Sequence, residues 1–328
     1  MMKKSLTRLA TCLTFSLGLI AVGAMPSFAA DYPTRPVRLV VPFGAGGASD
    51  QLARMLGLKL ADRLGQPVII DNKPGAGTTL GIMAVKNAEP DGYTLLLGGT
   101  SGVVNQALDK TVAFNASKDF AGVSIVGEIP YILLVNAQVP AKTFQEFATL
   151  LKSAPGKYNY ASGGVGSSNH FAMELLLTMM GAQAVHVPYN SSATSIGSVA
   201  AGETQFTFDT PITAKPQIAG NKVRALATST AARTRSLPEV PPAGESGVPG
   251  YEVTGYFSIV APAKTPRDVV TRLNKEIIAV MSEPEMSSKL LALGLDSKTS
   301  TPEAADQRTA AELARWSKLA QDLKLQKN

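Results

Sequence analysis

Two glycine-rich loops contain the residues of this sequence that could bind an anion. The first loop comprises Phe43, Gly44, Ala45, Gly46, Gly47, Ala48 and Ser49 and lies between a predicted buried strand and a predicted helix. A helix start offers backbone N–H groups and the positive end of the helix dipole, which favour a carboxylate or phosphate. Glycine lets the backbone approach such a ligand closely. The alternative is a plain tight turn, in which Ser49 caps the helix and Asp50 of the first turn has a structural role.

The second loop has the same strand-to-helix setting farther along the chain. It comprises Ser162, Gly163, Gly164, Val165, Gly166, Ser167 and Ser168. The hydroxyls of Ser167 and Ser168 could donate hydrogen bonds to an oxyanion. Taken alone, this loop would favour an ordinary capped helix. Two such loops in two domains, facing each other across a cleft, would instead form a clamp for an acid group.

Two further polar residues lie near the predicted ends of strands. Tyr189 follows the segment from His186 to Pro188, and it could line a pocket or simply pack with its hydroxyl in water. Asp209 follows a short apolar strand and precedes Thr210 and Pro211. It could receive a ligand amine or hydroxyl, or it could serve only as a turn-forming residue.

Several other chemistries are disfavoured by the sequence. The segment Gly44-Ala45-Gly46 is followed by Ser49 where a dinucleotide fingerprint requires a third glycine, and no phosphate-binding P-loop pattern occurs. No nucleophile elbow occurs either. The only two histidines, His170 and His186, have no matched carboxylate spacing for a metal. We therefore expect no cofactor, no metal and no enzyme activity. A secreted serine hydrolase using Ser167 or Ser168 with His170 is a disfavoured alternative, because no orienting acid is evident.

The amino terminus has the three-part pattern of a signal peptide at residues 1–29. Lys3, Lys4 and Arg8 precede an apolar run from Leu9 to Ala24, and the small residues before position 30 fit a cleavage site after Ala29. Cleavage would remove Cys12, the only cysteine, so thiol chemistry and disulfides are not expected in the mature chain. The formal charge of +6 includes three charges from this segment, and the remaining Lys and Arg are scattered. This pattern does not suggest a nucleic-acid partner.

Strand and helix patterns alternate along the rest of the chain, which predicts an α/β protein with mostly parallel sheets flanked by helices. The predicted strands are Val37–Val41, Val68–Asp71, Tyr93–Leu97, Gly122–Val126, Tyr131–Val135, Tyr158–Ala161, Val185–Val187, Gln205–Phe208, Ala225–Thr228 and Tyr256–Val260. The predicted helices are Ser49–Leu64, Leu80–Lys86, Phe144–Lys152, Asn169–Met180, Ala193–Ala201, Pro266–Met281, Pro284–Leu293 and Pro302–Leu323. Candidate crossings at Gly127–Pro130 and Gly250–Gly255 predict two domains, formed by residues 30–127 with 254–328 and by residues 128–253.

The chain resembles the substrate-binding receptors of tripartite tricarboxylate transporters, also called the Bug or TctC-like family. The similarity extends from Tyr32 to about Trp316. Its markers are Tyr32-Pro33-Thr34-Arg35-Pro36-Val37-Arg38, Pro42-Phe43 with Gly46-Gly47 and Asp50, Asn72-Lys73-Pro74-Gly75-Ala76-Gly77, Pro90-Asp91-Gly92-Tyr93-Thr94, Pro155-Gly156-Lys157-Tyr158-Asn159-Tyr160, His186-Val187-Pro188-Tyr189, Lys222-Val223-Arg224-Ala225-Leu226-Ala227 and Pro249-Gly250-Tyr251. The family's lysine-glycine after the tyrosine is replaced here by Asn190-Ser191, and its Asn after the strand-end Asp is replaced by Thr210.

This resemblance implies a two-domain, Venus-flytrap receptor of the periplasm that is not an enzyme. It implies that backbone N–H groups and hydroxyls of the loops Phe43–Ser49 and Ser162–Ser168 grip a ligand carboxylate, with Asp209 near the far wall. The expected partners are a small organic carboxylate or amino acid and the membrane subunits of a tripartite transporter, with the receptor itself a monomer. A ligand-sensing subunit of a signalling system is the alternative that the sequence leaves open.

Overall fold

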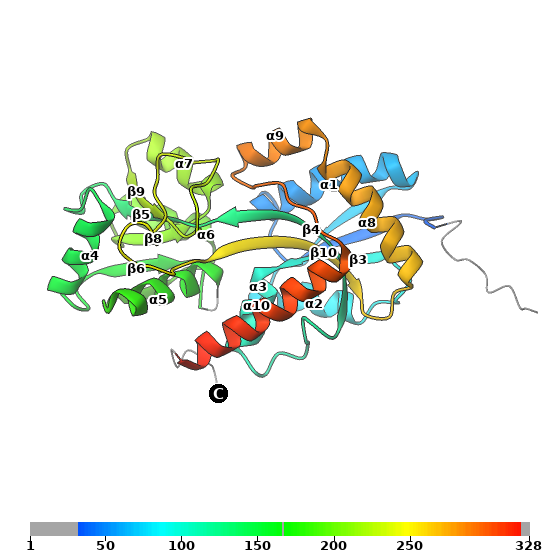
Figure 1. The fold of residues 1–328 in the computed structure, drawn as a ribbon, viewed down its shortest axis with the longest axis horizontal. Coiled ribbons are helices and arrows are strands. Elements are labelled where there is room, and N and C mark those ends of the chain that lie inside the picture. Colours follow the sequence, from blue (N-terminus) through cyan, green and yellow to red (C-terminus); the bar gives the residue numbers. More distant parts are fainter. Residues whose placement is uncertain (1–31, 166, 323–328) are drawn as a thin grey trace, which may run out of the picture.

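The computed structural model describes residues 32–165 and 167–322, so the predicted signal peptide and Gly166 lie outside the described residues. Two lobes, each built on one five-stranded sheet with helices packed against it, lie side by side (Figure 1). The predicted two-domain α/β class is confirmed. Each sheet buries its apolar faces against helices, and the main core of the second sheet also takes in residues of α3 (Thr100–Leu108) and α10 (Pro302–Asp322).

The first sheet has the strand order β2-β1-β3-β10-β4. Strands β1 to β3 pair in parallel, whereas β10 runs antiparallel to both of its neighbours, β3 and β4. Their bounds are β1 Val37–Val41, β2 Val68–Asn72, β3 Thr94–Gly99, β4 Phe120–Pro130 and β10 Thr254–Pro262.

The second sheet repeats this arrangement with the order β7-β6-β8-β5-β9. Strands β6, β7 and β8 pair in parallel, and β5 runs antiparallel to β8 and β9. Their bounds are β5 Ile132–Asn136, β6 Asn159–Ser162, β7 Val185–Pro188, β8 Phe206–Asp209 and β9 Val223–Thr228. Both sheets are therefore mixed. The antiparallel strand is β10 in the first sheet and β5 in the second. Each of them is the first strand that the chain forms after it crosses from the other lobe.

The described part of the chain has ten α-helices and one short 3-10 helix, of which α8, α9 and α10 follow the last strand, β10. The predicted helices are present, and two more, α3 and α7, follow strands directly where no helix was predicted. The helices are α1 Ala48–Leu64, η1 Ala76–Thr78, α2 Thr79–Lys86, α3 Thr100–Leu108, α4 Phe144–Ser153, α5 Ser168–Met180, α6 Ser192–Ala201, α7 Pro211–Ala219, α8 Arg267–Met281, α9 Pro284–Ala292 and α10 Pro302–Asp322.

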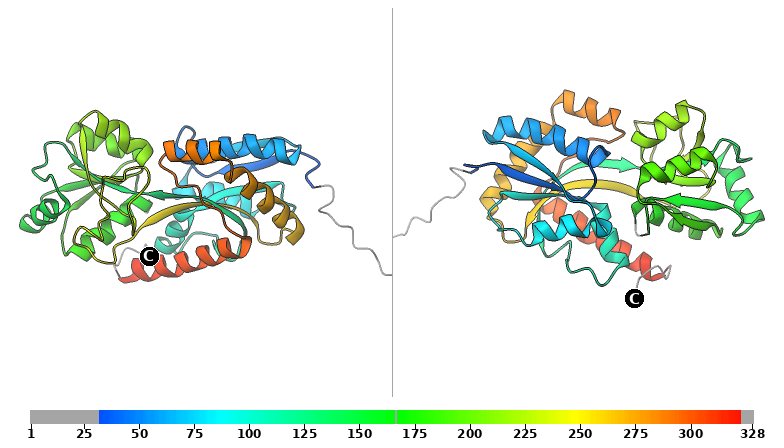
Figure 2. Two further views of the ribbon diagram at one scale, coloured as in Figure 1. Left: turned by 45° about the horizontal axis from the view of Figure 1, so that its top comes forward. Right: turned by 180° about the vertical axis from the view of Figure 1, so that it is seen from behind.

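Helices α3 and α10 connect the two lobes. The core of the second lobe includes Val103 and Val104 of α3 and Trp316 of α10 together with Phe171 of α5. Helix α10 runs along one side of the molecule from the first lobe toward the second (Figures 1 and 2). The lobes therefore share buried apolar contacts in addition to the strands that pass between them.

Candidate ligand-binding site

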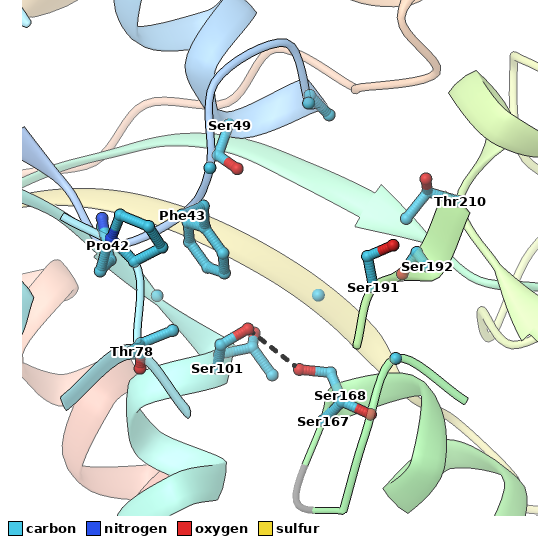
Figure 3. Close-up of a pocket in the computed structure, with 18 of the residues that line it drawn as sticks. Pro42, Phe43, Ser49, Thr78, Ser101, Ser167, Ser168, Ser191, Ser192 and Thr210 are labelled. Carbon is cyan, nitrogen blue, oxygen red and sulfur yellow. Dashed lines mark hydrogen bonds between the residues drawn. The ribbon is translucent and has the colours of Figure 1, made fainter. Parts of the chain in front are cut away.

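A cavity of about 910 Å³ lies between the lobes, where six strand-to-helix loops meet (Figure 3). Each loop follows the carboxyl end of a strand, which is where open α/β sheets usually bind ligands. The first lobe contributes Pro42–Ser49 and Gln51, then Pro74, Gly75, Gly77, Thr78 and Ile82, then Leu97–Gly102 and Asn105. The second lobe contributes Gly163, Val165, Ser167, Ser168, Asn169, Asn190–Ala193, Thr210, Ile212 and Thr213. The crossing strands supply the floor, with Ile129, Tyr131 and Gly255–Phe257.

None of the described residues that line this cavity carries a charged side chain. The polar groups are hydroxyls, side-chain amides and the backbone of the helix starts of α1, α2, α3, α5, α6 and α7. Each helix start presents N–H groups that have no intrahelical acceptor, together with the positive end of the helix dipole. The lining thus offers backbone N–H donors without a cationic side chain, which suits a bound anion.

Asp50 holds the first loop in place. Its Oδ2 accepts hydrogen bonds from Gly46 N (2.8 Å) and Arg54 Nε (3.0 Å), and its Oδ1 accepts one from Asn72 Nδ2 (3.1 Å). Burial raises the pKa of Asp50, but the hydrogen bonds from Arg54, Gly46 and Asn72 outweigh burial and hold the pKa below its ordinary value. Asp50 is therefore an ionised residue that shapes the loop, as the sequence suggested.

The expectation that Ser49 caps α1 is wrong. The cap residue is Gly47, no side chain caps this helix start, and Ser49 lies inside the first turn. A glycine cap leaves the helix start open toward the cavity, because no side chain covers its N–H groups.

The second loop is held by its own polar residues. Ser167 caps α5 by accepting from His170 N (3.4 Å), and its hydroxyl is close to Gly164 O (2.6 Å) and Asn169 Oδ1 (2.6 Å). Asn169 also accepts from Gly163 N (3.3 Å). These contacts fix the loop so that Ser167 and Ser168 line the cavity.

The structure brings most of the predicted site residues together at this cavity. The first-lobe residues Phe43 to Ser49 all line it, and so do Gly163, Val165, Ser167 and Ser168 of the second lobe. The ring of Phe43 points toward the space between the lobes (Figure 3). The two predicted hollows therefore face one shared space, which was the geometric requirement of the clamp.

Four other predicted residues do not line the cavity. Ser162 is buried, and its Oγ lies 2.6 Å from Nε2 of His186. Gly164 is absent from the lining, and its carbonyl accepts from Ser167 Oγ (2.6 Å). Tyr189 packs against an apolar cluster that includes Ile196 and Val199 of α6. Asp209 is 1% exposed, and its Oδ1 accepts from Thr210 N (2.7 Å) and Thr213 Oγ1 (2.7 Å) at the start of α7. Neighbours of Tyr189 and Asp209, namely Asn190 and Thr210, line the cavity in their place.

Sequence reasoning missed the loop between β3 and α3, although Gly98-Gly99-Thr100-Ser101-Gly102 has the same glycine and hydroxyl composition as the two predicted loops. Gly99 has a φ of +140°, and a Cβ there would lie 2.0 Å from Tyr256 O, so only glycine fits beside β10. Thr100 Oγ1 accepts from Tyr256 N at 2.9 Å. This loop therefore joins the cavity wall to a strand that crosses between the lobes.

The starts of α6 and α7 also line the cavity, although their residues were not among the predicted ligand contacts. Ser191 caps α6 by accepting from Thr194 N (3.2 Å), a pattern that its Ser-x-x-Thr spacing could have indicated. Across the cavity, Ser101 of α3 lies within hydrogen-bonding distance of Ser168 of α5, at 3.3 Å between the two Oγ atoms (Figure 3).

The two histidines form a stacked pair in the second lobe. Their ring centroids lie 4.1 Å apart, and the ring of Tyr160 stacks on His186 at 4.8 Å. Burial lowers the pKa of His170 to about 3, assisted by His186, and burial lowers the pKa of His186 to about 4. Both rings are thus neutral and weakly basic at neutral pH. Among the described residues, no group of His, Cys, Asp and Glu could hold a metal ion.

Comparison with known proteins identifies the family. Residues 52–325 match the family described as "Tripartite tricarboxylate transporter family receptor", TctC, and the chain belongs to this family. It is 35% identical over 301 residues to the "UPF0065 protein in tcbD-tcbE intergenic region" of Pseudomonas sp. (strain P51), covering 90% of this chain and 89% of that protein.

Two solved structures have similar folds and sequences. The structure titled "R. palustris Rpa4515 with adipate" has a TM-score of 0.83 and 32% identity, with 90% of this chain and 99% of that chain covered. "MatC (Rpa3494) from Rhodopseudomonas palustris with bound malate" has a TM-score of 0.80 and 31% identity, with 88% of this chain and 99% of that chain covered.

Family membership settles the class of protein. The chain is a solute-binding receptor and not an enzyme, and receptors of this family are periplasmic. Within the described part of the chain, no helix has the length and apolar character needed to cross a membrane.

Proposed function

We propose that this chain is exported through a cleaved signal peptide at residues 1–29 and captures a small carboxylate between its lobes. We further propose that it delivers the ligand to the membrane subunits of a tripartite tricarboxylate-type transporter. The observation that carries the proposal is the cavity itself, in which six helix starts converge and no described lining side chain is charged. The adipate and malate bound by the two similar receptors support a carboxylate as the ligand.

The chemistry of the cavity is sufficient for such a ligand. A hydrogen bond to a carboxylate contributes roughly 1.5–3 kcal/mol, so a few backbone and hydroxyl donors can hold an acid group without arginine. Because the fold already positions these donors, binding orders few flexible side chains. We propose that the ligand-binding residues are Phe43–Ser49 of the first lobe and Gly163, Val165, Ser167 and Ser168 of the second, joined by the loops at Ser101, Ser192 and Thr210.

A thermal shift experiment tests this proposal. The protein is expressed with its own amino-terminal segment, purified from the periplasmic fraction and heated with a panel of mono- and dicarboxylates. We expect at least one acid to raise the melting temperature, because a ligand that binds only the folded state stabilises it by about 2.7 kcal/mol at a hundred times its Kd. If no acid on a broad panel raises the melting temperature or produces heat in calorimetry, the proposed function is wrong. Recovery only from the cytoplasm would contradict the proposed export.

A further inference from the structure

The turn that follows helix α9 brings the first lobe into direct contact with the second. Gly294 of this turn lies against Pro211, the first residue of α7, and both residues are buried. A Cβ at position 294 would lie 2.6 Å from Cγ of Pro211 and still closer to its Cβ. In Figure 1, α9 and α7 face each other across the boundary between the lobes, on the side of the molecule opposite α10. Because glycine has no Cβ, the lobes approach each other more closely here than another residue would allow.

The first lobe holds this turn rigidly. Leu295 N donates to Leu290 O (2.9 Å), and the side chains of both leucines are fully buried in the first-lobe core. Just after the turn, Asp296 N donates to Glu128 O and Glu128 N donates to Asp296 O, both at 2.9 Å. Glu128 lies close to the end of β4 at Pro130, where the chain crosses to the second lobe. The turn is therefore fixed beside the crossing strands.

The second lobe holds Pro211 in a similar way. Its ring fixes its own backbone φ angle at the start of α7. Thr210 N and Thr213 Oγ1 donate to Asp209 Oδ1, both at 2.7 Å, and Thr210 O accepts from Ala214 N (3.0 Å). Thr210 also lines the cavity. A displacement of Pro211 therefore moves the cavity wall of the second lobe with it.

We propose that Gly294 is a positioning residue for ligand binding, because its contact with Pro211 sets how closely the second lobe approaches the first. This inference rests on the proposed carboxylate-binding function. Ordinary carbon–carbon contacts are about 3.5–4.0 Å, so a methyl group at position 294 would force this contact to open by at least about 1 Å.

The two sides of the contact are held by their own lobes, so the added methyl group would move the lobes apart. The contact lies near the crossing strands, and the displacement is therefore larger at the cavity, farther from the crossing. A ligand that bridges the lobes would lose hydrogen bonds to one of them, since a donor–acceptor distance of about 3.6 Å is no longer a hydrogen bond.

The substitution Gly294→Ala tests this proposal, and Gly65→Ala is its matched control. Gly65 also follows a helix of the first lobe, α1, and its φ of +68° is close to the +75° of Gly294. A Cβ at position 65 would have no atom within 4 Å. Both variants therefore introduce a similar backbone strain, and only Gly294→Ala adds a clash with the other lobe. Circular dichroism establishes whether each variant folds.

The first measurement is the separation of the lobes without ligand. Spin labels are attached at Ser288→Cys of α9 and Ala219→Cys of α7, since both positions are exposed and the only cysteine, Cys12, lies in the proposed signal peptide. We expect double electron–electron resonance to give a longer mean distance when Gly294→Ala is added and the same distance when Gly65→Ala is added. An unchanged distance with Gly294→Ala overturns the inference, whatever the protein binds.

The second measurement is the affinity for a carboxylate that binds the wild type, by isothermal titration calorimetry. We expect Gly294→Ala to weaken binding by at least about fivefold, the lower end of usual coupling between sites, and Gly65→Ala to retain the wild-type affinity. Equal affinities of the two variants overturn the role of Gly294 in binding. If no acid binds the wild type, the proposed function is wrong, and the label distance still decides whether Gly294 sets the spacing of the lobes.

A compensating substitution separates this contact from any other effect of the new methyl group. Pro211→Gly removes the Cβ and Cγ that the methyl group would meet, so the double variant Gly294→Ala/Pro211→Gly should match Pro211→Gly alone in label distance and affinity. If Gly294→Ala alone does not fold, recovery of the fold in the double variant supports the contact, because Pro211→Gly by itself lowers stability. A double variant that regains neither the fold nor the label distance overturns the inference.

Discussion

Asp50 and Asp209 have similar places in the chain but opposite electrostatic environments. Each lies where a strand meets a helix of the cavity wall, and each accepts a backbone N–H of its own loop. Asp50 has three hydrogen-bonding partners that keep it ionised. Asp209 has one buried oxygen, Oδ2, without a hydrogen-bond partner, and burial raises its pKa to about 7 despite the hydrogen bonds from Thr213 and Thr210.

The raised pKa of Asp209 predicts a pH-dependent stability. Its pKa is about 7 in the folded protein against an ordinary value of 3.8, so the folded state holds a proton that the unfolded state releases. The contribution of Asp209 to stability therefore decreases as the pH rises from about 4 to about 7 and is constant above that. Asp209→Asn, which keeps the Oδ1 acceptor, should remove this dependence.

The measurement is the free energy of unfolding of both proteins by denaturant titration at several pH values. His170 and His186 act in the opposite direction, since their lowered pKa values make stability rise with pH up to about 6.5. Subtracting the two profiles isolates Asp209, because both proteins contain the same histidines. Parallel profiles from pH 4 to pH 8 would show that Asp209 does not titrate in this range.

Among the structural elements, the helix starts determine the chemistry of the cavity and α10 determines how the lobes are joined. The cap of α1 is a glycine, whereas α5 and α6 are capped by serine side chains. Helix α10 packs against β4 and α3, and its Trp316 is 1% exposed with its ring edge-to-face on Phe171 at 4.9 Å. The indole Nε1 donates to Glu312 Oε2 at 2.6 Å.

Removing the indole of Trp316 should loosen this connection between the lobes. We expect Trp316→Ala to reduce the free energy of unfolding by about 3–5 kcal/mol, the usual cost of truncating a buried aromatic side chain. The matched control Trp316→Phe keeps a ring against Phe171 and loses the hydrogen bond to Glu312, so its cost should be nearer 1–2 kcal/mol. Equal unfolding midpoints for the wild type and Trp316→Ala would contradict a structural role for this contact.

In the whole molecule, the passages between the sheets define where the lobes could move. Along the chain, β4 of the first sheet ends at Pro130 and β5 of the second sheet begins at Ile132. Only Tyr131 lies between these two strands. Ser229 N donates to Tyr131 O (2.8 Å) and Val253 N donates to Ser229 O (2.7 Å), so both crossings are tied at one place. We propose a hinge here between the domain of residues 30–127 with 254–328 and the domain of residues 128–253.

Closure about this hinge should be visible in solution. Small-angle X-ray scattering should give a radius of gyration of about 20 Å without ligand, as expected from the chain length. This value should fall when a binding carboxylate is added, because the closed form makes more contacts with the ligand and is favoured by it. Adding a non-binding acid at the same concentration serves as the control. An unchanged radius at saturation would show that binding does not close the lobes.

The local patterns of this sequence were sufficient to predict most of the helices and strands and the positions of two glycine-rich loops. The strand Val37–Val41 was predicted with its observed bounds, and the glycine loops at Phe43–Ser49 and Ser162–Ser168 were correctly placed between strands and helices. Helices α3 Thr100–Leu108 and α7 Pro211–Ala219 are not among the predicted elements. Strand alternation and amphipathic spacing depend on near neighbours, which is why the sequence alone could determine these features.

Only the tertiary structure decided which helix starts share one cavity and which side chains reach it. Asp209 and Tyr189 were open alternatives in the sequence because a residue at the end of a strand can face a ligand or the core. The packing of α6 and α7 on the second sheet buries Asp209 and turns Tyr189 against apolar residues. The loop at Ser101 reaches the cavity because β10 returns from the other lobe and pairs beside β3. The pairing of Phe257 with Gly99 joins residues more than a hundred positions apart, beyond the range of any local pattern.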